Sequence, residues 1–152
     1  MKFIDLKKQY QYFKKDIDKC VESVLVSDYY LLGDNLNNFE KNFSKHIGLK
    51  NTVCVKNCTD AITLLIKELG KDKPIIMPNF GAYPTAVACK NVTDNIYYVD
   101  VDDSLTVDVN KLPDIKNGIV IGVNLFGNNI NPKIKEYTKK NGHILIEDCA
   151  QS

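Results

Sequence analysis

The sequence predicts an α/β fold in which a mostly parallel sheet carries helices on both faces and follows two leading helices. Short apolar segments rich in β-branched residues alternate with helical stretches after Gly48. Several of these segments, IIMP, IVIGV and ILIE among them, are apolar at consecutive positions, which is the pattern of a strand covered on both faces. Parallel strands need long crossover connections, so we expect right-handed crossovers through the intervening helices.

Two helices are expected before Gly48. Apolar residues recur at helical spacing between Lys7 and Val26. Asp34 follows Gly33 and is expected to cap the second helix, which Gly48 closes. The apolar stripe of that second helix stands at i, i+3, i+7 and i+11, namely Leu36, Phe39, Phe43 and Ile47.

The rest of the chain is expected to alternate between strands and helices. The segment Asp102–Gly118 is polar and contains one proline, so we expect a loop with a short helix there. The chain therefore divides into a helical segment, residues 1–48, and an α/β part, residues 49–152. Five strands are expected, at Thr52–Val55, Ile75–Met77, Ile96–Val101, Ile119–Val123 and His143–Glu147. Three helices are expected between them, near Thr59–Leu69, Thr85–Cys89 and Pro132–Lys140.

Composition excludes several classes of protein. The 152 residues are 44% hydrophobic and 26% charged, which are ordinary globular values that argue against wholesale disorder. A formal net charge of +1 provides no bulk field that would favour nucleic acid or a membrane surface, and no arginine occurs. No 18-residue apolar run is present and the start MKFIDLKKQY is too polar for a signal peptide, so we expect a cytoplasmic protein.

The five cysteines do not indicate a metal site or a disulfide framework. Their number is odd, their spacing is irregular and no C-x-x-C pair occurs, while His46 and His143 are far apart in sequence. We expect the cysteines to be small buried hydrophobic residues of a protein in a reducing compartment.

Three strand-to-helix junctions carry residues that could bind a ligand, because ligands of open α/β sheets bind at the carboxyl ends of the strands. In the first junction, Cys58 and Thr59 begin a helix whose free backbone N–H groups could bind phosphate. The same pattern is that of an ordinary helix cap, so by itself it leaves both interpretations open.

The other two junctions present aromatic and acidic side chains. In PNFGAYPTA a glycine and two prolines fix a bend, which displays Phe80 and Tyr83 for stacking on a flat cofactor or for packing in the core. In EDCAQS, Asp148 follows an apolar strand, and a buried aspartate needs a cation or hydrogen-bond donors. A protonated pyridine nitrogen would be such a cation, and a solvated turn aspartate is the alternative.

Seven segments, in order, resemble the N-terminal part of the DegT/StrS family of sugar aminotransferases. The resemblance extends over nearly the whole chain and implies the fold-type I aminotransferase architecture, with pyridoxal 5'-phosphate as cofactor. It also implies that residues 1–152 form part of the large, cofactor-binding domain. The segments are FIDLKKQY, SDYYLLGDNLNNFEKNFSKHIG, NCTDAITLLI, PNFGAYPTA, YYVDVD, NLFGN and EDCAQS.

Residue by residue, the resemblance implies five cofactor-binding positions. Thr59, with the backbone of Cys58, matches the family's phosphate-binding turn. Asp148 matches the aspartate that pairs with the pyridinium nitrogen, and Gln151 matches the residue that hydrogen-bonds the phenolic oxygen of the ring. Tyr83 is the choice for the ring-stacking aromatic, although the commonest family pattern has its aromatic where Ala82 stands.

The chain departs from the family pattern in three places. Cys58 stands where the family turn usually has glycine, and Asn124 and Phe126 replace the commoner histidine and tyrosine. The family's Schiff-base lysine lies in a Ser-x4-Lys pattern downstream of the D-x-x-Q motif, and no serine before Ser152 has a lysine five residues on. We therefore expect no catalytic residue in this chain, and we expect the isolated polypeptide to be an inactive N-terminal fragment whose C-terminal remainder is absent.

The resemblance implies amino transfer from glutamate to a nucleotide-linked keto sugar, carried out by a homodimer. Three alternatives stay open for the chain itself. It could be one subunit of a split enzyme, or belong to the dehydratase branch of the family, which uses pyridoxamine phosphate and has histidine in place of the lysine. It could also be a non-catalytic α/β binding module.

Overall fold

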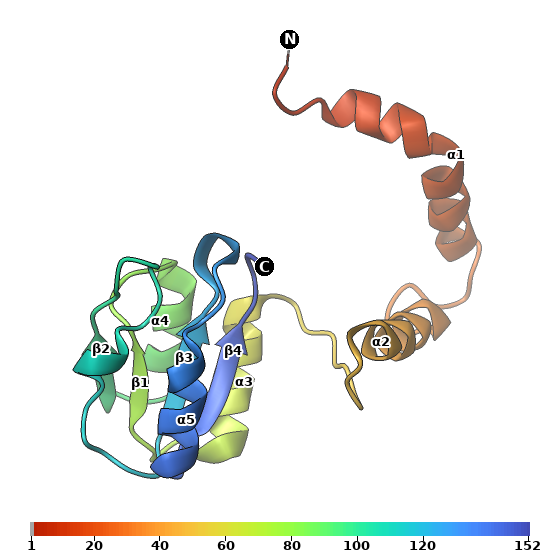
Figure 1. Ribbon diagram of the computed structural model, residues 1–152. Helices are drawn as coiled ribbons and strands as arrows, with labels where there is room; N and C mark the ends of the chain where they lie inside the picture. Colours follow the sequence, from red (N-terminus) through yellow and green to blue (C-terminus); the bar gives the residue numbers. More distant parts are fainter. Residues whose placement is uncertain (1) are drawn as a thin grey trace. The chain divides into compact units, whose positions relative to one another are not determined.

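The computed structural model describes residues 2–152 and consists of two compact units (Figure 1). The first unit is helical and ends at Cys54, and the second is an α/β unit that comprises Val55–Ser152. The division between the two units therefore falls between Cys54 and Val55.

The helical unit contains the two helices that the apolar spacing predicts. Helix α1 comprises Leu6–Leu25, and the carboxylate of Asp5 caps it by accepting the backbone N–H of Lys8 at 3.0 Å. Helix α2 comprises Asp34–Ile47 and ends at Gly48, whose φ of 70° is the left-handed conformation that glycine adopts most easily.

One detail of α2 differs from the prediction. Asp34 is its first helical residue and Gly33 is the N-cap, so no side chain caps this helix. The carboxylate of Asp34 instead lies in the first turn, where a negative charge meets the positive end of the helix dipole.

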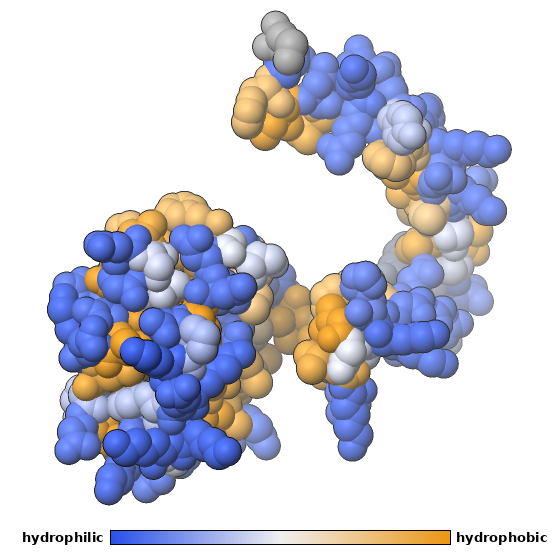
Figure 2. Space-filling view, in the orientation of Figure 1, coloured by the Kyte–Doolittle hydropathy of each residue, from blue (hydrophilic) through white to orange (hydrophobic). Residues whose placement is uncertain are grey.

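The apolar stripes of these two helices are solvent-exposed. No residue of α1 is buried, and Ser44 is the buried residue of α2. Figure 2 shows apolar side chains gathered along both helices. The exposed members of the two stripes are Leu6, Tyr10, Phe13, Ile17, Val21, Leu25, Phe39, Phe43 and Ile47.

The expected strand at Thr52–Val55 is wrong, because this segment is irregular in the structure. Its contacts run to α2, since the Thr52 hydroxyl lies 2.7 Å from that of Ser44 and Cys54 N–H donates to a Glu40 carboxylate oxygen at 2.7 Å. Val53 is 77% exposed. β-Branched composition alone does not make a strand, because a strand needs a neighbouring strand to satisfy its backbone.

The α/β unit contains a four-stranded, wholly parallel sheet in the order β2-β1-β3-β4. The strands are β1 (Ile75–Pro78), β2 (Ile96–Val99), β3 (Ile119–Val123) and β4 (Ile144–Asp148). Every residue of the two central strands β1 and β3 is buried, which explains their uninterrupted apolar sequences. In the register, Ile75 lies beside both Ile96 and Ile119.

Helices cover both faces of this sheet, as predicted (Figure 1). Helices α3 (Cys58–Gly70) and α4 (Tyr83–Lys90) pack together on one face, and α5 (Pro132–Lys140) packs on the other. The predicted loop after β2 contains the short helix η1 (Val109–Lys111), and η2 (Leu125–Gly127) follows β3. The core between the sheet, α3 and α4 contains Ile62, Ile66, Ile75, Met77, Ala88, Cys89, Ile119, Ile121, Val123, Leu125 and Ile146.

The prediction that the cysteines are buried is wrong for most of them. Among residues 2–152, Cys89 is the buried cysteine, and it belongs to α4, from which it packs into the core. Cys20 and Cys54 are exposed in the helical unit, whereas Cys58 and Cys149 are exposed near the carboxyl ends of strands.

The strand order creates a topological switch point at the carboxyl edge of the sheet. From β1 the chain goes to β2 on one side and then crosses to β3 on the other, so the direction of winding reverses between β1 and β3. Ligands of open α/β sheets bind outside the carboxyl ends of the strands at such a point. The three junctions singled out in the sequence all lie at this edge.

Candidate functional site

The site is built around the carboxylate of Asp148, the last residue of β4. Asp148 is 7% exposed, and its two oxygens accept hydrogen bonds from three different segments. The Thr85 hydroxyl donates to Oδ2 at 2.9 Å, while the backbone N–H of Ala150 donates to Oδ1 at 3.1 Å. The Cys58 thiol also lies 3.5 Å from Oδ1. A buried carboxylate needs such donors, and these bonds hold the side chain in one orientation.

The first turn of α3 lies beside this carboxylate. Asn57 is the N-cap, and its side-chain oxygen accepts the backbone N–H of Asp60 at 2.8 Å. In the part of the chain that the structure describes, no side-chain or loop acceptor binds the N–H groups of Cys58 and Thr59, the first two residues of the helix. The positive end of α3 therefore presents open donors next to Asp148.

The Cys58 thiol stays protonated in this environment. Although Cys58 as a whole residue is exposed, partial desolvation of its thiol is the main cause that raises the pKa of this group, to about 11, and the nearby carboxylate of Asp148 adds to the effect. A neutral thiol is a hydrogen-bond donor, which matches its position 3.5 Å from Asp148 Oδ1.

The segment after β4 is tied to the segment after β3. The side chain of Asn124, 5% exposed, donates to Cys149 Sγ at 3.2 Å and accepts the N–H of Ile130 at 3.1 Å. The Gln151 side-chain oxygen accepts the N–H of Phe126 at 2.8 Å. With its oxygen engaged, the Gln151 amide presents its NH₂ group as a donor.

The junction between β1 and α4 forms one wall of a hollow of about 210 Å³. Tyr83, the first residue of α4, is 80% exposed and lines this hollow, as do Phe80, Tyr98 and Thr85. The structure therefore brings Tyr83 to the same strand edge as Asp148. It also offers Phe80 and Tyr98 as further aromatic walls.

Sequence reasoning missed Thr85 and the role of Asn124. Thr85 is 4% exposed and bonds to the carboxylate of Asp148, which lies 63 residues away in sequence. Only the fold brings these two side chains together. The usable signal was the polar residue in the first turn of a helix that follows a strand end.

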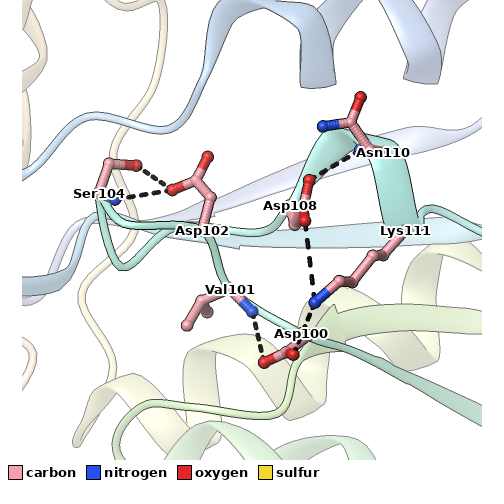
Figure 3. A network of polar contacts seen from close by, with 7 residues as sticks. All are labelled: Asp100, Val101, Asp102, Ser104, Asp108, Asn110 and Lys111. Atoms are coloured by element: carbon pink, nitrogen blue, oxygen red, sulfur yellow. Dashed lines mark hydrogen bonds and ion pairs between the residues drawn. The ribbon is translucent and has the colours of Figure 1, made fainter.

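A second polar cluster follows β2 and is separate from this site (Figure 3). The Lys111 ammonium lies 2.8 Å from an Asp100 carboxylate oxygen and 3.9 Å from one of Asp108. Asp102 accepts the backbone N–H of Ser104 at 2.9 Å. These contacts pin the loop that leads into η1. Among residues 2–152 no group of three or more His, Cys, Asp or Glu side chains is placed so that it could hold a metal ion.

Comparison with known proteins decides the family. The model of the DegT/DnrJ/EryC1/StrS aminotransferase family matches residues 11–152. The chain belongs to this family. The three junctions of the strand edge all lie inside the matched region.

Several family relatives are transaminases of nucleotide-linked sugars. A dTDP-3-amino-3,6-dideoxy-alpha-D-galactopyranose transaminase from Aneurinibacillus thermoaerophilus is 29% identical over 99% of this chain and 43% of its own length. A UDP-2-acetamido-2-deoxy-3-oxo-D-glucuronate aminotransferase from Pseudomonas aeruginosa is 30% identical over 100% of this chain and 44% of its own length. The chain thus spans about two-fifths of the length of the curated relatives it matches.

Solved structures give the same fold. A DegT DnrJ EryC1 StrS aminotransferase from Brucella abortus is similar with a TM-score of 0.85 at 27% identity, over 100% of this chain and 44% of the other. S. venezuelae DesV, solved in complex with a ketimine intermediate, has a TM-score of 0.89 at 25% identity, over 99% of this chain and 43% of the DesV chain. The fold is that of the N-terminal part of a fold-type I aminotransferase. No helix in residues 2–152 is long and apolar enough to cross a membrane.

Proposed function

We propose that the strand edge around Asp148 binds pyridoxal 5'-phosphate, as part of an aminotransferase that acts on a nucleotide-linked keto sugar. One observation carries the proposal. A buried carboxylate lies within hydrogen-bond distance of the first residue of a helix whose leading N–H groups are open. A negative charge that can pair with a cation therefore lies beside N–H donors that can bind an anion. A phosphorylated pyridinium carries both charges.

The residues present fit such a cofactor. Open N–H groups of Cys58 and Thr59 at the positive end of α3 suit a phosphate, and the Thr59 hydroxyl adds a donor. The carboxylate of Asp148 has about four lone-pair sites, and three donors occupy three of them. One site therefore remains for a protonated ring nitrogen. The free NH₂ group of Gln151 suits a phenolic oxygen.

Each of these residues has a defined task in the proposed site. Thr59 and the backbone of Cys58 bind the phosphate, and Asp148 holds a proton on the ring nitrogen by ion pairing with it. Gln151 orients the ring through its phenolic oxygen, and Tyr83 stacks against the ring. When bound, the cofactor supplies an electron sink for the substrate. We further propose that no lysine of residues 1–152 is the Schiff-base lysine of the family pattern, because no serine before Ser152 is followed by a lysine five residues on.

The wider activity is inferred from relatives. Their names support a nucleotide-linked keto sugar as acceptor, and glutamate is the proposed amino donor. We further propose that the protein acts in the cytoplasm as a homodimer, and that residues 1–48 and 49–152 are two parts of one large cofactor-binding domain.

A dehydratase is the second candidate function. The chain is 26% identical to a GDP-4-keto-6-deoxy-D-mannose 3-dehydratase from Yersinia pseudotuberculosis, over 88% of this chain and 37% of its own length. Such an enzyme would use the same residues toward the cofactor and would differ at the lysine position.

Reading the source DNA beyond codon 152 tests the activity and separates the two candidates. An open frame with a Ser-x4-Lys pattern is the result expected for an aminotransferase, and a histidine at the lysine position would identify the dehydratase. A stop codon with no complementing reading frame nearby would contradict both enzymes and leave a binding module.

A further inference from the structure

The hydroxyl of Thr85 and the carboxylate of Asp148 form a pair of buried polar side chains at the strand edge. Thr85 is 4% exposed and Asp148 is 7% exposed, and the Thr85 Oγ1 to Asp148 Oδ2 distance is 2.9 Å. An ionised carboxylate only accepts hydrogen bonds, so Thr85 must be the donor to it. Exposed pairs exchange partners with water, whereas a buried pair of this kind is held in place.

The three donors to Asp148 are unevenly divided between its two oxygens. Oδ1 receives the backbone N–H of Ala150 and the thiol of Cys58, whereas Oδ2 receives the Thr85 hydroxyl alone. Each carboxylate oxygen has two lone-pair sites, so Oδ2 is the oxygen with acceptor capacity to spare. Asp148 Oδ2 is therefore the oxygen that can still bind a cation, and the hydrogen bond from Thr85 holds it in place.

The position of Thr85 in the fold explains how it can do this. It is the third residue of α4, which begins at Tyr83, so its side chain lies in the first turn of that helix. Cys58 is the first residue of α3. The Asp148 carboxylate therefore contacts the first turns of two helices, whose positive ends favour its negative charge.

We infer that Thr85 is a positioning residue for the cofactor: its hydroxyl orients Asp148 so that Oδ2 meets the ring nitrogen. This inference rests on the proposed pyridoxal phosphate site and deepens it. Thr85 itself is placed against Asp148 and not against the ring. Its effect should therefore appear only with a ligand that has a ring nitrogen.

The test compares two ligands, pyridoxal 5'-phosphate and its 1-deaza analogue, which has carbon in place of the ring nitrogen. Dissociation constants are measured for the full 152-residue chain and for three variants by fluorescence titration. Thr85→Val removes the hydroxyl and keeps the branched shape, and Thr85→Ser restores the hydroxyl. Thr63→Val is the matched control, because the Thr63 hydroxyl also contacts α4 but donates to the backbone oxygen of Ala88 at 3.3 Å.

The unmodified chain should prefer pyridoxal 5'-phosphate over the deaza analogue, and Thr85→Val should reduce this preference about tenfold, which is about 1.4 kcal/mol. Thr85→Ser and Thr63→Val should retain it. Affinity for inorganic phosphate should be unchanged in Thr85→Val, because the phosphate turn is intact.

Contrary outcomes separate the inference from the proposed function. If Thr85→Val weakens both ligands equally, or neither, Thr85 has a merely structural role and the inference is overturned. If the unmodified chain binds neither ligand, or binds both with equal affinity, the proposed pairing of Asp148 with a ring nitrogen fails, and the positioning role of Thr85 fails with it.

Discussion

At the scale of single residues, the site depends on the environment of one carboxylate. Asp148 is buried at the end of β4, and two of its donors, Thr85 and Cys58, come from different helices. Cys58, which belongs to the proposed phosphate turn, places its thiol 3.5 Å from Asp148 Oδ1.

The first prediction concerns the reactivity of Cys58. Burial and the charge of Asp148 raise its pKa from 9.0 to about 11, so little thiolate is present at pH 8. Alkylation by iodoacetamide, followed residue by residue by mass spectrometry, should be roughly tenfold or more slower at Cys58 in the folded chain than in the same chain in urea. Asp148→Asn should speed the reaction at Cys58, because it removes the charge that opposes ionisation.

The raised pKa of Cys58 also determines how the stability of the folded chain changes with pH. A thiol whose pKa is higher in the folded chain favours folding while it is protonated, so its contribution is full below about pH 9 and is lost as the pH rises toward 11. Urea unfolding at pH 8 and pH 11 measures this loss. The free energy of unfolding should fall less between these two pH values in Cys58→Ser than in the unmodified chain. Fast alkylation of Cys58 at pH 8 would contradict the assigned environment.

At the scale of elements, the sheet depends on close approaches between backbone segments. A Cβ added at Gly118, just before β3, would lie 2.6 Å from the backbone oxygen of Pro74. Backbone cannot move aside as a side chain can. At Gly122, inside β3, the added Cβ would meet the side chain of Ile130 at 2.9 Å, and that side chain can shift.

Gly118→Ala should therefore lower the free energy of unfolding by about 1–3 kcal/mol, as overpacking typically does. Gly122→Ala is the matched comparison inside β3 and should lower the free energy of unfolding by less than Gly118→Ala does. Urea unfolding followed by circular dichroism measures both. Equal losses, or a larger loss for Gly122→Ala, would show that the approach of Pro74 to Gly118 does not control this junction.

Sequence patterns predicted most elements, and the failures have physical causes. Periodicity and apolar segments place α1, α2 and the four strands, because the spacing of apolar residues is a local property that differs between helices and buried strands. The same reasoning placed a strand at Thr52–Val55, where composition is right but no neighbouring strand pairs with the segment. It did not find the contact between Thr85 and Asp148, because packing brings together two residues that lie 63 positions apart in sequence.

At the scale of the whole molecule, stability is divided unequally between the two units. The α/β unit buries isoleucines of β1 and β3 completely, and burial of each such side chain contributes about 1.5–3 kcal/mol. In the helical unit, α1 has no buried residue. A helix without tertiary burial has little beyond its own hydrogen bonds to keep it closed.

Hydrogen–deuterium exchange of the full chain should reveal this difference. Amides of α1 should exchange orders of magnitude faster than those of β1 and β3, because opening α1 exposes no buried apolar surface. Peptide-resolved mass spectrometry over seconds to hours measures both in one sample, which provides its own control. Equal protection of α1 and β3 would mean that the apolar stripe of α1 is covered in solution.

Direct titration of the full chain with pyridoxal 5'-phosphate tests the central claim, that the strand edge around Asp148 is a cofactor site. We expect saturable binding that Asp148→Asn weakens about tenfold or more, through loss of the charge that pairs with the ring nitrogen. Asp100→Asn, which alters a carboxylate of the separate loop network, should bind as the unmodified chain does. Absence of saturable binding, or equal weakening by the two substitutions, would contradict the account.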